Sequence, residues 1–160
     1  MERTKSIANR LEEVLLNGRW IANTNFKSQI ENLSREQATH KIGTLNSIAA
    51  LTFHVNYYLE GLTSVLNGGQ LEIKDKYSFD MPPIESDSDW KKLVAEFISN
   101  SEAFIRGVQS LDDSKLDDVF FDEKYGNYQR NIEGVIEHSY YHLGQVSLIR
   151  KLLETTTPAT

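Results

Sequence analysis

The sequence predicts an all-α protein, a four-helix bundle with long connections and short extra helices. Four segments of the 160-residue chain carry apolar residues at the three- and four-residue spacing of an amphipathic helix. Two of the connections between them are longer than a minimal up-and-down bundle needs, which leaves room for a crossover topology. The length suits one domain with one core, which we place at residues 1–154, followed by a flexible tail at residues 155–160.

The first half of the chain holds two of the long helices. One face of the first helix carries Ile7, Leu11, Val14 and Leu15. Asn17-Gly18 should end this helix, because both residues tolerate the left-handed backbone conformation that closes helices. A less regular stretch follows, with short helices expected near residues 26–30 and 34–38. The second long helix is expected from about Ser47 to Asn67 and has a broad apolar face.

The second half begins with a long connection at residues 70–89, which contains a Pro-Pro pair and is expected to be partly extended. Side-chain oxygens between Ser86 and Asp89 can cap free backbone N–H groups, so the third helix should begin there. An aromatic-rich connection follows at residues 120–129. The last helix is expected from near Asn127 to about Glu154.

Composition and charge exclude several functional classes. The formal net charge of −6, without a clustered basic surface, argues against a nucleic-acid partner. No apolar run is long enough to span a membrane, and the N-terminal residues lack the apolar core of a signal peptide, so we expect a cytoplasmic protein. The absence of cysteine excludes disulfides, thiolate metal ligands and a thiol nucleophile.

Polar residues interrupt the apolar face of the last helix. Each residue advances about 100° around a helix axis, so His138, His142 and Gln145 lie on one face, within the apolar arc. Burying such groups costs roughly 1–3 kcal/mol each unless they find partners. Neutral imidazole is a common metal ligand, so a metal ion is one such partner. Hydrogen bonds to carbonyls, tyrosines or Gln145 are the structural alternative.

The second long helix offers a third imidazole. His54 lies on its apolar side, and if the two helices pack side by side, three histidines converge. Three protein ligands leave positions open for water or substrate, the pattern of a catalytic metal site. Tyr57, Tyr58 and Tyr141 are candidate pocket residues that would hydrogen-bond a substrate. His40, among polar residues, is expected at the surface.

The residues around these histidines support a family assignment. The pattern H-x-x-x-H-x-G-Q, here "HSYYHLGQ", resembles the last helix of the DinB/YfiT-like superfamily, and "LTFHVNYYLEG" resembles its histidine-bearing second helix. The resemblance covers most of the chain and is greatest to one subgroup. It implies a four-helix bundle, often a homodimer, with zinc, nickel or iron on three histidines. Carried over by position, the ligands would be His54, His138 and His142.

The resemblance implies a metal-dependent hydrolase or thiol-dependent transferase whose substrate is a small molecule, such as a thiol. Gln145 would then orient a ligand histidine or a metal-bound water. No carboxylate stands out as a general base; Asp75, Asp80, Asp122 and Glu123 lie in connections that the sequence cannot place. Two alternatives stay open: a non-catalytic bundle that binds a small ligand or a partner through buried structural histidines, and a metal-binding or stress-response protein without turnover.

Overall fold

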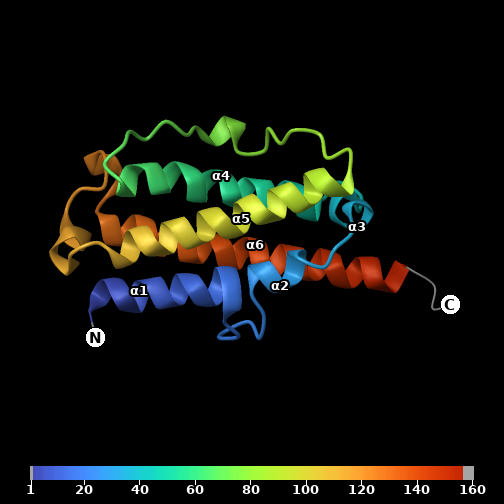
Figure 1. Ribbon diagram of the computed structural model, residues 1–160, viewed down its shortest axis with the longest axis horizontal. Coiled ribbons are helices and arrows are strands. Elements are labelled where there is room, and N and C mark those ends of the chain that lie inside the picture. The colour runs from blue at the N-terminus through green and yellow to red at the C-terminus, as the bar shows by residue number, and fades with distance from the viewer. Residues whose placement is uncertain (1, 157–160) are drawn as a thin grey trace.

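Four long helices lie side by side along the length of the molecule in the computed structural model, which describes residues 2–156 (Figure 1). They are α1 (Arg3–Glu12), α4 (Ile48–Leu66), α5 (Asp87–Gln109) and α6 (Tyr128–Thr156). Two short helices, α2 (Phe26–Ile30) and α3 (Arg35–Thr39), lie between α1 and α4. Within the described residues no strand forms, apart from an isolated antiparallel bridge between Val119 and Asn127. The predicted all-α bundle is therefore confirmed.

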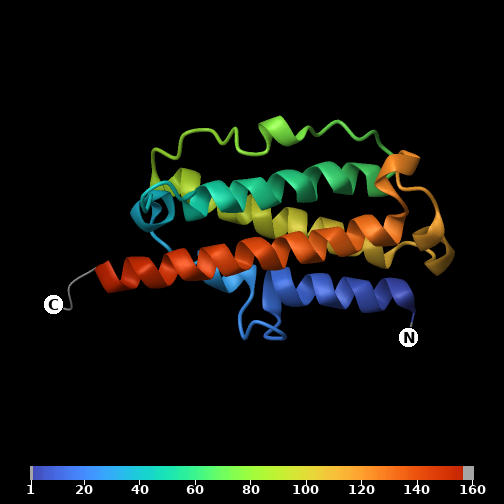
Figure 2. The same cartoon turned by 180° about the vertical axis from the view of Figure 1, so that it is seen from behind.

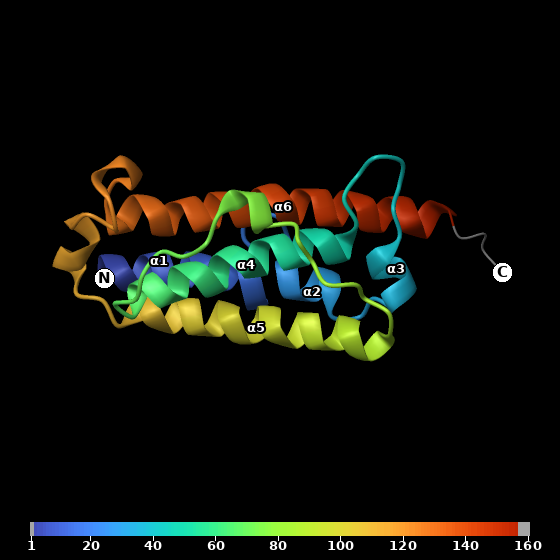
Figure 3. The ribbon, with the colours of Figure 1, turned by 90° about the horizontal axis from the view of Figure 1, so that it is seen from above.

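The helices form a closed ring in which α4 and α1 each contact both α5 and α6. From behind, α6 lies between α4 and α1 (Figure 2). Helices α4 and α5 run in the same direction, so the chain must return along the whole bundle between them (Figure 3). Residues 67–86 make this return, and we call residues 70–85 the strap. The expected crossover topology follows from this parallel pair.

Local capping explains where the long helices begin. The Ser47 hydroxyl accepts a hydrogen bond from the backbone N–H of Ala50 at the start of α4. Ser86 and Asp89 form a reciprocal capping box at the start of α5. At α6, the side chain of Asn127 accepts from the backbone N–H of Arg130. These caps lie within two residues of the predicted helix starts.

The core is continuous through the ring and is closed at one end by the short helices. Phe26 of α2 stacks on Phe97 of α5 with ring centroids 4.8 Å apart, and both side chains are fully buried. The buried indole of Trp90 donates a hydrogen bond of 2.9 Å to the carbonyl oxygen of Leu33. These contacts fix the segment between α2 and α3 against α5, so the irregular region before α4 is held in place.

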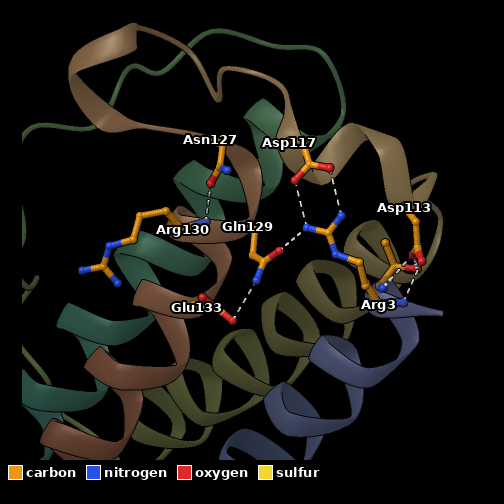
Figure 4. Close-up of polar contacts among 8 residues, drawn as sticks. Arg3, Asp113, Asp117, Asn127, Gln129, Arg130 and Glu133 are labelled. Atoms are coloured by element: carbon orange, nitrogen blue, oxygen red, sulfur yellow. Dashed lines mark hydrogen bonds and ion pairs between the residues drawn. The ribbon is translucent and has the colours of Figure 1, made fainter. Parts of the chain in front are cut away.

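A polar cluster at the other end joins the N-terminus of α1 to the segment that precedes α6 (Figure 4). The Arg3 guanidinium binds both carboxylate oxygens of Asp117 at 2.9 Å and also contacts the side chain of Gln129. Asp113 accepts hydrogen bonds from the first backbone N–H groups of α1. The contacts of Arg3 are exposed, so each contributes little to stability.

The C-terminal boundary differs slightly from the prediction. Helix α6 extends to Thr156, two residues past the expected end at Glu154, and residues 157–160 of the predicted tail lie outside the described residues. None of the described helices is both long and apolar enough to cross a membrane.

Candidate metal centre

Three histidines converge between α4 and α6. His54 comes from the middle of α4, and His138 and His142 come from consecutive turns of α6. The Nε2 atom of His138 lies 3.0 Å from Nε2 of His54 and 3.0 Å from Nε2 of His142. One ring nitrogen of each histidine lies within 4.8 Å of those of the other two. His54 and His142 are buried and His138 is partly buried, so the cluster lies inside the helix seam.

This geometry suits a shared cation better than a network of hydrogen bonds. A neutral imidazole has one N–H and one lone pair. If Nε2 of His138 carries the proton, it can donate one good hydrogen bond, either to His54 or to His142. The remaining Nε2 atom then faces His138 without a hydrogen bond. A cation between them accepts all three lone pairs. Tetrahedral metal–nitrogen bonds of about 2.0–2.1 Å place ligand nitrogens about 3.3 Å apart, close to the 3.0 Å spacing of His138 from each of the other two histidines.

Electrostatics keep the three imidazoles neutral. Burial, followed by the proximity of His142, lowers the pKa of His54 to about 4, although the Ser78 backbone and Asp75 oppose this shift. Burial and the other two histidines lower the pKa of His138 to about 4. Burial also lowers the pKa of His142, against the opposing hydrogen bond with Gln145. At neutral pH all three therefore hold the unprotonated form that metal ligation requires.

A second layer of contacts orients two of the rings. The Oε1 atom of Gln145 lies 2.7 Å from Nδ1 of His142, so that Nδ1–H donates to the amide and Nε2 keeps its lone pair. The ring of Phe79 in the strap stacks on His54 with centroids 4.0 Å apart and planes 10° apart. Within residues 2–156, no hydrogen bond of good geometry reaches the buried Nδ1 atom of His54, which the backbone of Ser78 approaches.

Tyr58 is the predicted pocket tyrosine that lies at the cluster itself. Its ring meets the edges of His54 and His138, with centroids 5.2 Å apart in both pairs. Its hydroxyl donates a 2.8 Å hydrogen bond to Oδ1 of Asp75 in the strap. Burial and this carboxylate raise the pKa of Tyr58, so the phenol stays protonated at neutral pH.

The other two tyrosines contact the strap and the solvent-exposed side of the cluster. The hydroxyl of Tyr57 donates to the carbonyl oxygen of Lys74 at 3.0 Å and accepts from its backbone N–H at 2.8 Å, so it anchors the strap to α4. The ring of Tyr141 lies 4.9 Å from that of His142, but its side chain is 64% exposed. Tyr57 therefore holds the strap over the site, and Tyr141 lies at the solvent-exposed edge of the site.

Among the carboxylates that the sequence left unplaced, the strap brings Asp75 to the site. Asp122 instead accepts a hydrogen bond from the backbone N–H of Lys124 in the turn before α6. Phe79 was not predicted as a site residue, because the apolar alternation at Leu71 and Ile73 is interrupted at Asp75, before Phe79 is reached. The one available signal was the phenylalanine in a segment of polar residues and one tyrosine, "KYSFD".

A cleft of about 420 Å³ opens beside His138. Its walls come from α4, α6, the strap and the segment that precedes α6, and it includes Tyr58 and Asp75. This volume lies within the usual range of small-molecule sites. The histidine cluster therefore adjoins a space that a small molecule can occupy.

Comparison with known proteins gives one match. The family model described as the DinB superfamily matches residues 22–146, a range that contains all three histidines and Gln145. No curated protein and no solved structure matches. Because the match covers well over half of the 160 residues, the chain belongs to the DinB superfamily.

Proposed function

We propose that this protein is a divalent-metal-dependent enzyme, a hydrolase or thiol-dependent transferase that acts on a small molecule. The metal ligands are His54, His138 and His142, and imidazole suits zinc, nickel and iron alike. The observation that carries the proposal is the position of His138 Nε2, 3.0 Å from the Nε2 atoms of both other histidines. A divalent ion held there supplies a Lewis acid that lowers the pKa of a water or a thiol.

The surrounding residues have separable roles in this proposal. Gln145 fixes the ring of His142 through Nδ1, and Phe79 covers the face of His54 and limits its contact with water. Tyr58 holds a proton on its hydroxyl next to the cleft, hydrogen-bonded to Asp75. Three protein ligands, as opposed to four, are typical of metal sites that bind a substrate or water.

We also propose that the protein forms a homodimer through the outer face of α6. Tyr141 and Leu148, two turns apart on this helix, are 64% and 56% exposed. Exposed apolar side chains aligned on one helix face support an interface. Sedimentation equilibrium at micromolar concentration should give twice the chain mass of 18.3 kDa, whereas a Tyr141→Glu, Leu148→Glu variant should remain monomeric. A monomeric wild-type protein would contradict this part of the proposal.

Elemental analysis of protein purified without a histidine tag tests the metal site. The wild type should carry close to one divalent ion per chain, and His142→Ala should lose it. His40→Ala is the matched control, because His40 is exposed and lies outside the cluster, and it should retain the metal. Equal metal content in His142→Ala and the wild type would refute the assignment of ligands.

Turnover is tested separately. The metal-loaded wild type should hydrolyse ester or amide substrates, or transfer a thiol, in a panel where His142→Ala is inactive. Stoichiometric metal without turnover across that panel would refute the enzymatic part of the proposal and leave a metal-binding protein.

A further inference from the structure

Three segments with regularly spaced lining residues form the cleft beside His138: α6, the strap and α4. On α6, Asn131, Gly134, Val135 and His138 line it, with the three- and four-residue spacing of one helix face. This stripe continues directly into the face that carries His142. The metal ligands and the α6 wall of the cleft are therefore one continuous surface, about 10 Å long between Asn131 and His138.

The opposite walls make the middle of the cleft apolar. Leu71 and Ile73 alternate along the strap, as side chains on one side of an extended segment do, and Leu62 of α4 lies one turn beyond Tyr58. Phe120 and Val135 complete this apolar section. A molecule that fills it must present hydrocarbon surface along most of its length.

The α6 wall has a gap at Gly134. A Cβ atom built on Gly134 meets no atom within 4 Å, although this glycine lines the cleft. The space next to the helix backbone is thus part of the cleft and is not filled by another side chain. A larger side chain at this position would fill part of the cleft without a steric clash with other residues.

The two ends of the cleft carry opposite charges. Asp75 lies near the histidines, where it accepts a hydrogen bond from Tyr58, whereas Arg130 lies about 12 Å from His138 along the axis of α6. The Arg130 guanidinium lies 3.1 Å from Glu137, but both side chains are more than 60% exposed, so this ion pair is weak. Figure 4 shows Arg130 directed away from the cluster around Arg3, so that cluster does not occupy its guanidinium. A ligand carboxylate that displaces Glu137, both of whose oxygens contact this guanidinium, can therefore form paired hydrogen bonds with Arg130.

We propose that the cleft binds an elongated small molecule with an apolar body and a carboxylate at the end remote from the histidines. Arg130 binds the carboxylate, and the apolar section holds the body. The other end, which reaches His138, carries the reacting group. This inference rests on the proposed function for the reaction, but the binding itself depends only on the cleft.

Octanoate and 1-octanol are suitable probes, since they share an apolar chain of about the length of the cleft and differ in charge. Calorimetric titration of the untagged protein, as purified and again after chelation, should show tighter binding of octanoate than of octanol. Gly134→Leu should weaken both probes about tenfold or more, as expected when roughly two methylene groups lose their burial. Arg130→Gln should weaken octanoate about tenfold and leave octanol unchanged.

Gly144→Leu is the matched control for the cleft, because Gly144 lies on the same helix, also has no atom within 4 Å of a built Cβ, and does not line the cleft. Gly144 shares the proposed dimer face with Tyr141 and Leu148, so the oligomeric state of this variant is measured alongside. Gly144→Leu should bind both probes as the wild type does. Gly134→Ala adds only one methyl group and serves as a second variant if Gly134→Leu does not fold. Circular dichroism and metal content should be unchanged in each variant.

Equal probe affinity in Gly134→Leu and the wild type would overturn the proposed binding site. Loss of octanoate binding on chelation, with no effect of Arg130→Gln, would place the carboxylate on the metal and overturn the proposed orientation. If the wild type holds no metal but Gly134→Leu still abolishes probe binding, the proposed function fails and the binding site stands.

Discussion

Replacement of Gly61 by alanine tests whether the strap is seated on α4 as the structure shows. Alanine in place of an interior helical glycine normally stabilises a protein by about 0.5–1 kcal/mol. At Gly61, however, the new methyl group would overlap Cγ2 of Ile73 and lie 3.0 Å from its Cδ1 and 3.1 Å from its Cγ1. Ile73 is β-branched and has little freedom to rotate away, so the strap itself must shift.

Overpacking of this kind costs about 1–3 kcal/mol, which exceeds the gain in helix propensity. We therefore expect Gly61→Ala to lower the free energy of unfolding by about 1 kcal/mol. Gly144→Ala, where the added methyl group meets no atom within 4 Å, should raise it by about 0.5–1 kcal/mol. The contrast between the two identical substitutions isolates the contact with Ile73.

Urea denaturation in the presence of chelator measures both effects without a contribution from bound metal. Ile73→Ala should be destabilising in the wild type but nearly neutral in the Gly61→Ala background, because it removes the atoms that clash. The double-mutant cycle should then give a coupling free energy of about 1–3 kcal/mol. Equal stabilisation by Gly61→Ala and Gly144→Ala would show that the strap does not rest on α4, and would refute this account.

Three further predictions concern the site and the core. Gln145→Ala should weaken metal affinity about 10–100-fold in equilibrium dialysis, because the ring of His142 loses its orienting partner; unchanged affinity would remove Gln145 from the site. Phe97→Ala should lower the free energy of unfolding by about 3–5 kcal/mol in urea, since the ring is fully buried, and a loss below about 1 kcal/mol would contradict the packing. The metal-free protein should lose stability as the pH falls from about 6.5 to about 4. The pKa of His54 and of His138 is about 4 in the folded protein and 6.5 in the unfolded chain, so over this range the unfolded chain binds more protons. His138→Gln should show a smaller loss in thermal melts over that range, and an equal loss would contradict the lowered pKa values.

The helices were predictable because their signals are local. Ser47 and Ser86 accept hydrogen bonds from backbone N–H groups only three residues away, and the apolar periodicity lies within each helix. The end of α6 was less well defined, since no glycine follows Glu154 and Pro158, which cannot continue a helix, comes four residues later. Short-range chemistry thus fixed the helix starts more closely than this helix end.

The site was only partly predictable, for the same reason. His138 and His142 share a helix face by spacing alone, but His54 joins them only because α4 and α6 are neighbours in the ring. The family resemblance supplied that pairing, which periodicity within one helix cannot give. The positions of Asp75 and Phe79 were harder to predict, because they depend on the path of the strap. That path is set by contacts with Tyr57 and Gly61 of α4, which are distant in the sequence.

The strap links the two halves of the proposed function. The strap is hydrogen-bonded to Tyr57 and packs against Gly61 of α4. The same segment covers His54 with Phe79 and lines the apolar part of the cleft with Ile73. A change that lifts the strap should therefore alter both sites together. Gly61→Ala is expected to release bound metal to a chelator faster than the wild type and to weaken octanoate binding, although it touches neither a metal ligand nor Arg130. If only one of these properties changed, the strap would act on the two sites independently.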